Sequence, residues 1–115
     1  MKKLLPALLL LATPASAETA INVYANVMAA SVSAAHICPN VGLSNEFFKK
    51  MAWQMEMTDK DTLAASRIAI DRLDEIERIA KESGEEAWCA RVLPKLMKPI
   101  NAGELAPLYA KKGGI

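Results

Sequence analysis

Two cysteines, Cys38 and Cys89, restrict the fold of this chain more than any other feature of its sequence. A disulfide between them would close a long loop and fix two distant segments side by side. The chain-entropy treatment assigns such a loop about 4 kcal/mol of stabilisation. Because a small domain has a net stability of roughly 5–10 kcal/mol, the state of this one pair would decide much of the fold.

The first 17 residues indicate that the cysteines meet an oxidising environment. The basic start MKK is followed by a short apolar run over residues 4–12 and by the small residues ASA at 15–17, the layout of a secretory signal peptide. A membrane-spanning helix needs about 20 apolar residues, and this run is shorter and contains Pro6. We predict cleavage after Ala17 and export to the bacterial periplasm.

In that compartment an even pair of cysteines is typical of a disulfide. The alternative is a reactive or metal-binding thiol, for which the segment HIC at 36–38 is the candidate. Side chains two residues apart point to different sides of a helix, so His36 and Cys38 do not form a ready ligand pair. The sequence therefore predicts a Cys38–Cys89 disulfide and a structural or solvent-facing His36.

The remaining chain is under a hundred residues long, the size of one domain. Removing Lys2 and Lys3 from the 14 basic residues leaves 12 against 13 acidic ones, a net charge of −1. Nucleic-acid binding needs a clear basic excess, so we expect no nucleic-acid partner.

The segment after residue 17 shows helical patterns and no alternating strand pattern or tight hairpin turn. Helices are expected over about 20–35, from the cap at Ser44 to about Met57, over about 59–82, and after a capping box at Ser83–Glu86. We predict an all-α fold, a single-domain bundle of about four helices stapled by the disulfide. The expected division is a signal peptide at 1–17, a helical domain at 18–98, and an irregular basic tail at 99–115 that has several prolines and glycines.

Arg72 interrupts the apolar face of the third helix. Leaving a buried charge unpaired is costly, so Arg72 should extend its head to solvent or meet a counter-charge. The functional alternative is a contact with a partner or an anion. In the same helix, Asp74–Arg78 and Glu77–Lys81 are spaced for i,i+4 ion pairs.

The stretch MAWQMEM at 51–57 contains three thioethers and an indole. On one regular helix, Met51 and Met55 share a core-facing stripe, whereas Trp53 and Met57 point to the other side. Trp53 and Met57 are thus the candidate partner-binding patch. A Cu(I) site, for which thioethers are suitable ligands, would use His36, Met51, Met55 and Met57, but it would require the helix to end early so that Met57 turns round.

The sequence contains none of the common motifs for nucleophilic, metal-dependent or phosphate chemistry, and we expect neither an enzyme nor a cofactor. In size, compartment and two-cysteine layout, the chain is similar to the acid-stress periplasmic chaperones of the HdeA type, although no specific motif aligns. We expect a non-catalytic exported binding protein, chaperone-like or an envelope accessory factor, whose partner is a protein or an envelope surface and whose mature chain has no transmembrane segment. The alternative is a periplasmic Cu(I)-binding protein.

Overall fold

The structure is a computed structural model that describes residues 13–99 and 105–111, with side chains from residue 18 onward. Most of the expected signal peptide lies outside this part, so cleavage after Ala17 stays a prediction. The fold is the predicted all-α bundle of four helices, with two short strands added. The elements in chain order are α1 (Thr13–Ile37), β1 (Val41–Leu43), α2 (Asn45–Gln54), α3 (Asp59–Ser83), α4 (Glu85–Leu96) and β2 (Leu108–Ala110).

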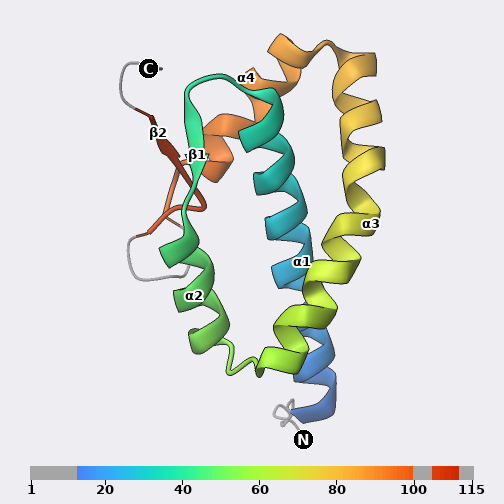
Figure 1. Cartoon of the computed structure of the whole chain (residues 1–115), viewed down its shortest axis with the longest axis vertical. Helices are drawn as coiled ribbons and strands as arrows, with labels where there is room; N and C mark the ends of the chain where they lie inside the picture. The colour runs from blue at the N-terminus through green and yellow to red at the C-terminus, as the bar shows by residue number, and fades with distance from the viewer. Residues whose placement is uncertain (1–12, 100–104, 112–115) are drawn as a thin grey trace, which may run out of the picture.

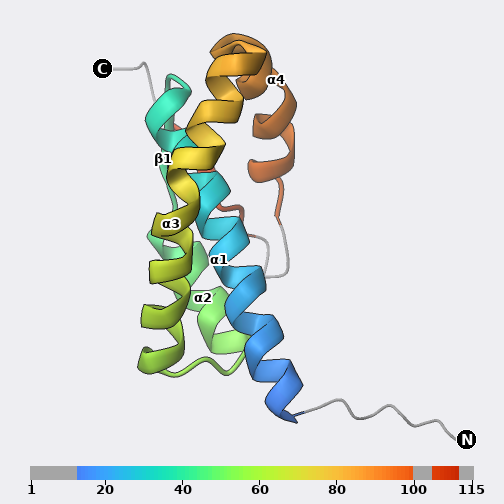
Figure 2. The same ribbon diagram turned by 90° about the vertical axis from the view of Figure 1, so that its right-hand side faces the viewer.

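Helix α1 lies at the centre of the molecule and packs most extensively against α3 (Figures 1 and 2). The two helices are side by side and run in the same direction, while α2 returns along α1 and α4 caps the end where α3 finishes. Small residues on α1, Ala25, Ala29 and Ser33, are completely buried and let the neighbouring backbones approach closely. Ser33 is buried because other elements pack against several sides of α1.

The helix start predicted at Ser44 is confirmed, and the helix expected from about residue 59 begins at Asp59 with Thr58 as its cap. The Ser44 hydroxyl accepts a hydrogen bond from the amide of Phe47, and Thr58 forms a reciprocal capping box with Asp61. These bonds satisfy amides that have no partner within the helix. The predicted box at Ser83 is wrong: Ser83 is the last residue of α3, and Gly84 separates the helices with a φ of 91°.

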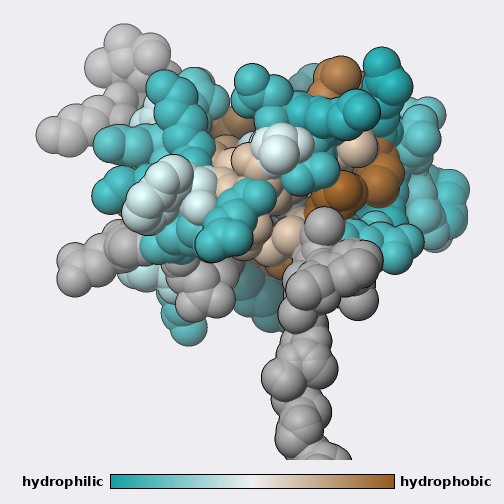
Figure 3. Space-filling view, turned by 90° about the horizontal axis from the view of Figure 1, so that it is seen from below, coloured by the Kyte–Doolittle hydropathy of each residue, from teal (hydrophilic) through white to brown (hydrophobic). Residues whose placement is uncertain are grey.

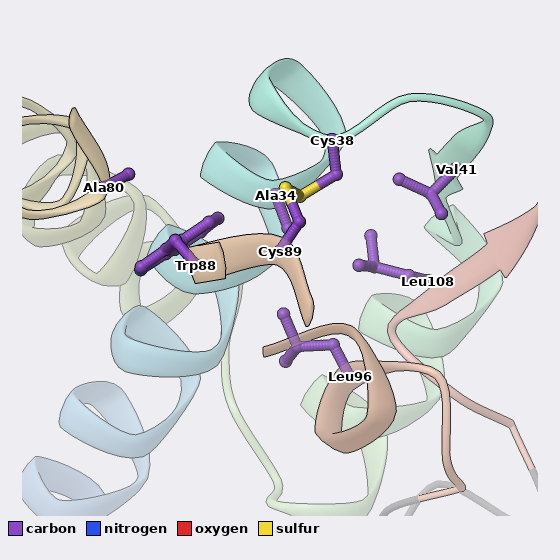
Figure 4. Close-up of a cluster of buried hydrophobic side chains, with 8 residues drawn as sticks. All are labelled: Ala34, Cys38, Val41, Ala80, Trp88, Cys89, Leu96 and Leu108. Carbon is purple, nitrogen blue, oxygen red and sulfur yellow. A yellow bond between two sulfur atoms is a disulfide. The ribbon is translucent and has the colours of Figure 1, made fainter. Parts of the chain in front are cut away.

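The first of two hydrophobic clusters surrounds the disulfide, and we call it the upper cluster (Figure 4). Its buried members are Ala34, Cys38, Val41, Ala80, Trp88, Cys89, Leu96 and Leu108. Cys38 and Cys89 are bonded as predicted, with Cα atoms 5.8 Å apart, so α4 is tied to the end of α1. Pro94 lies inside α4 but does not end it, because the helix continues to Leu96.

The strand pair β1–β2 was not predicted and changes the account of the tail. The strands are antiparallel, with Gly42 opposite Tyr109. Further bonds at both ends run from the Ser44 amide to the Pro107 carbonyl and from the Lys111 amide to the Asn40 carbonyl, each 2.8 Å. Part of the expected irregular tail is therefore ordered, and its Leu108 is buried in the upper cluster. Strands of three residues are too short to show a recognisable alternation.

The second cluster, the lower cluster, joins α1, α2 and the first half of α3. Its buried members are Tyr24, Ala25, Phe47, Phe48, Met51 and Ala65. Phe48 meets the rings of Tyr24 and Phe47 edge to face, with centroids 5.6 and 4.9 Å apart. Aromatic packing thus holds this end, where no covalent bond does. None of the helices in the described ranges is both long and apolar enough to cross a bilayer.

Candidate binding groove

The chain reverses sharply after α2, and this reversal shapes the candidate site. Helix α2 ends at Gln54, three residues before the predicted end, and Glu56 has a left-handed φ of 56°. The amide of Met57 then donates to the carbonyl of Ala52 at 2.9 Å. Because of this turn, Met57 packs back against the lower cluster, whereas Trp53 stays outside.

An open groove of about 650 Å³ lies beside this turn, between α1, α2 and the start of α3. We call it the Trp53 groove. Its apolar lining includes Tyr24 and Met28 from α1, Phe48 and Trp53 from α2, and Met57 from the connection to α3. Its volume falls within the range of about 300–1,000 Å³ that is usual for ligand sites, and such sites are mostly lined by apolar and aromatic side chains.

Trp53 is the most exposed large apolar side chain among the described residues, with 80% of its surface accessible. Met57, its predicted companion, is half-buried and lines the same groove. Seen from below, the molecule shows apolar side chains gathered at the centre with hydrophilic ones around them (Figure 3). The structure therefore brings the two predicted patch residues together, with Trp53 exposed and Met57 largely covered.

Tyr24 contributes a hydroxyl to the groove, beside the apolar side chains of the lining. Only 6% of this residue is exposed, and burial raises the pKa of its hydroxyl above the ordinary value. The group is therefore neutral at physiological pH and can donate or accept a hydrogen bond. No hydrogen bond joins it to any residue in the described part of the chain. Because Tyr24 lines the groove, its hydroxyl can form a hydrogen bond with a ligand there.

The groove has one cationic and one anionic group at its edge. Lys49 comes from α2 and Asp59 from the first residue of α3, and both are exposed. Neither belongs to an ion pair within the described ranges, where the salt bridge found is Arg78–Glu82 at 2.9 Å. The edge can therefore pair with charges of both signs on whatever occupies the groove.

The other predicted site residues lie away from the groove. His36 is exposed in the last turn of α1, and α1 and α2 end at opposite ends of the molecule (Figure 1). The four-residue ligand set that includes His36 is therefore not assembled. Arg72 is half-buried on α3, and the expected counter-charge is not found among the described residues. Arg78 pairs with Glu82 and not with Asp74 as predicted.

The described residues offer few groups for metal binding or for thiol chemistry. No group of three or more His, Cys, Asp or Glu side chains is placed to hold a metal ion there. Both cysteines are consumed by the disulfide. The residues that line the groove offer apolar, aromatic and charged groups for contact.

Apart from Trp53 and Met57, sequence reasoning missed the residues that line the groove, among them Tyr24, Met28, Lys49 and Asp59. Tyr24 and Met28 are four residues apart, so the sequence indicates that they share one face of a helix. It does not indicate whether that face is buried in the core or lines a groove. Which residues of α2 and α3 would meet that face depends on the reversal at Glu56. No pattern of three or four residues indicates that reversal.

Comparison with protein-family models, with curated proteins and with solved structures finds no match to this chain.

Proposed function

We propose that this chain is an exported, non-catalytic binding protein that holds an apolar segment of another periplasmic or envelope protein in the Trp53 groove. The observation that carries this proposal is the exposed Trp53 at the edge of an apolar groove. Tryptophan and tyrosine are enriched among residues that dominate binding energy at protein interfaces. Methionine side chains such as Met28 and Met57 adapt to differently shaped apolar partners.

The compartment supports the same proposal. The export pattern of residues 1–17 directs the chain to the periplasm, where proteins pass in unfolded form and expose apolar segments. A small protein with an adaptable groove is suited to cover such segments, either as a chaperone or as an accessory subunit of an envelope assembly. Mass spectrometry of the protein purified from the periplasm tests this premise, and the expected N-terminal residue is Glu18.

Binding is tested with the disulfide-intact protein from the periplasm and the hydrophobic dye bis-ANS as the probe. Trp53→Ala should weaken dye binding by about tenfold, because it removes the largest contact surface of the groove. Ile70→Ala is the matched control, since Ile70 is also an exposed apolar residue but does not line the groove. The same variants are then compared for suppression of the aggregation of a reduced client protein.

Two results would count against the proposal. If the wild-type protein neither binds the dye nor delays aggregation, the groove has no affinity for apolar segments. If Trp53→Ala and Ile70→Ala reduce binding equally, the dye reports general surface hydrophobicity and not the groove.

A second candidate function, Cu(I) binding, has one observation in its favour. The early end of α2 and the return of Met57 place Met51, Met55 and Met57 against the same cluster, which a regular helix would not do. His36 cannot join them, so the set is reduced to three thioethers, a soft ligand set that suits Cu(I). A bathocuproine competition titration decides this point, and an affinity no better than about millimolar removes the candidate function.

A further inference from the structure

We propose that the Trp53 groove is also a self-association surface, in which a second copy of this chain occupies the groove and inserts its own Trp53. Each copy carries both complementary parts, an exposed indole and an apolar groove beside it. An interface that uses the same patch on both copies is the arrangement of twofold dimers, the commonest oligomers of soluble proteins. This inference uses the groove but does not depend on the proposed client.

The lining of the groove suits an indole. Tyr24 and Phe48 offer aromatic faces and edges, and Met28 and Met57 offer polarisable sulfur atoms. The Met28 thioether is held by the Ser66 hydroxyl, with 3.8 Å between oxygen and sulfur. An aromatic side chain buries about 150–250 Å² when it enters such surroundings. Two tryptophans buried reciprocally give the interface its apolar centre.

The Tyr24 hydroxyl supplies a polar contact that a buried indole requires. The N–H of a tryptophan usually finds a hydrogen-bond partner when the ring is buried. Tyr24 is almost entirely buried and forms no hydrogen bond with the described residues. An indole N–H from the second copy can donate to this oxygen, and the twofold symmetry repeats the contact.

The charges at the groove edge fit the same symmetry. A twofold axis running along the groove sets the α2 side of one copy against the α3 side of the other. Lys49 then faces Asp59 of the second copy, and the contact is repeated by symmetry. Exposed pairs of this kind mainly set the register and the rate of encounter and add little affinity. Complementary charge at the edge thus supports a second copy of this chain as an occupant of the groove.

Sedimentation velocity of the disulfide-intact full-length protein, from micromolar to submillimolar concentration, tests the dimer. The wild-type protein should show a concentration-dependent dimer with a blue-shifted Trp53 emission. Trp53→Ala should raise the dimer dissociation constant by about tenfold or more. Tyr24→Phe should raise it several-fold while the circular dichroism spectrum is unchanged. A sedimentation coefficient that stays monomeric over the whole range would overturn the proposal.

Charge exchange tests the symmetry. Lys49→Glu and Asp59→Lys should each weaken the dimer, and the double variant should restore it because the two charges exchange sides. Lys50→Glu is the matched control, since it makes the same charge change on α2 at a residue that does not line the groove. A dimer that ignores all these variants, or that Lys50→Glu weakens equally, overturns the proposed interface.

The dimer and the proposed client binding can fail independently. If the protein is monomeric but Trp53→Ala still abolishes bis-ANS binding, the self-association is wrong and the proposed function stands. If the dimer forms and responds to charge exchange, but the protein diluted until it is monomeric binds no bis-ANS, the dimer stands and the client proposal is wrong.

Discussion

The two tryptophans of this chain have opposite environments, and they mark the difference between the two ends of the molecule. Trp88 is 5% exposed in the upper cluster, beside the disulfide, whereas Trp53 is 80% exposed at the edge of the lower cluster. Each tryptophan lies on a short helix, Trp53 on α2 and Trp88 on α4. The difference teaches that burial here is decided by what other elements cover a helix face.

The upper cluster is closed because many elements converge on it. Its residues come from α1, β1, α3, α4 and β2, and the Cys38–Cys89 bond holds two of these elements together. The buried members of the lower cluster come from α1, α2 and α3, and it relies on aromatic packing. With fewer elements available to cover it, the lower end keeps an open groove. The covalent bond therefore lies at one end, and the proposed binding groove lies at the other.

The largest expected effect is the loss of the disulfide. In Cys38→Ser/Cys89→Ser, the free energy of unfolding should fall by about 4 kcal/mol, because the unfolded chain is no longer restricted by a long loop. Urea unfolding followed by circular dichroism measures the change, and unfolding of the wild-type protein in reductant should give a similar value. A loss under about 1 kcal/mol would mean that the upper end does not depend on the covalent bond.

The next effect tests whether the lower cluster is a true core. Phe47→Ala should lower the free energy of unfolding by about 3 kcal/mol, at the low end for such truncations because the adjacent groove lets the site relax. Urea unfolding measures it under the same conditions as the disulfide variant. A cost within about 0.5 kcal/mol of zero would show that the lower cluster is loosely packed, since surface substitutions have effects of that size.

The cap of α3 at the lower end should contribute a smaller amount. Thr58→Ala removes the hydroxyl that accepts from the Asp61 amide at 3.1 Å, and the loss should be about 1 kcal/mol. Thr62→Ala, one turn later, is the matched control because its hydroxyl donates to the Asp59 carbonyl and does not cap the helix. Equal effects of the two variants in thermal unfolding would argue against the capping box.

The smallest effect concerns Tyr24 at high pH. Burial raises the pKa of its hydroxyl above the ordinary value of 10.0, so the unfolded chain loses this proton first. The stability that Tyr24 contributes is present below about pH 10 and is lost as the pH rises through the folded-state value. Between about pH 8 and 10.5, the wild-type protein should lose more unfolding free energy than Tyr24→Phe. The same pH dependence in both proteins would contradict the burial of this hydroxyl.

Local signals in the sequence predicted a large part of the fold. Ser44 and the Thr58–Asp61 pair act within one helical turn, so their caps could be read directly from residues three positions apart. The disulfide followed from the number of cysteines and the export pattern. Trp88, Cys89 and Leu96 have the spacing of an apolar stripe on one helix, and all three are buried.

The tertiary structure alone decided the strand pair and the groove. Val41 pairs with Ala110, almost seventy residues away, and no local pattern indicates a partner at that distance. The groove depends on the reversal at Glu56, which brings Met57 back to Tyr24 and Phe48 and leaves Trp53 outside. Hydrophobic periodicity states which face of a helix is apolar, because that is a property of consecutive residues. Whether that face is covered depends on the positions of distant elements, and for this protein they leave open the groove that we propose as the binding site.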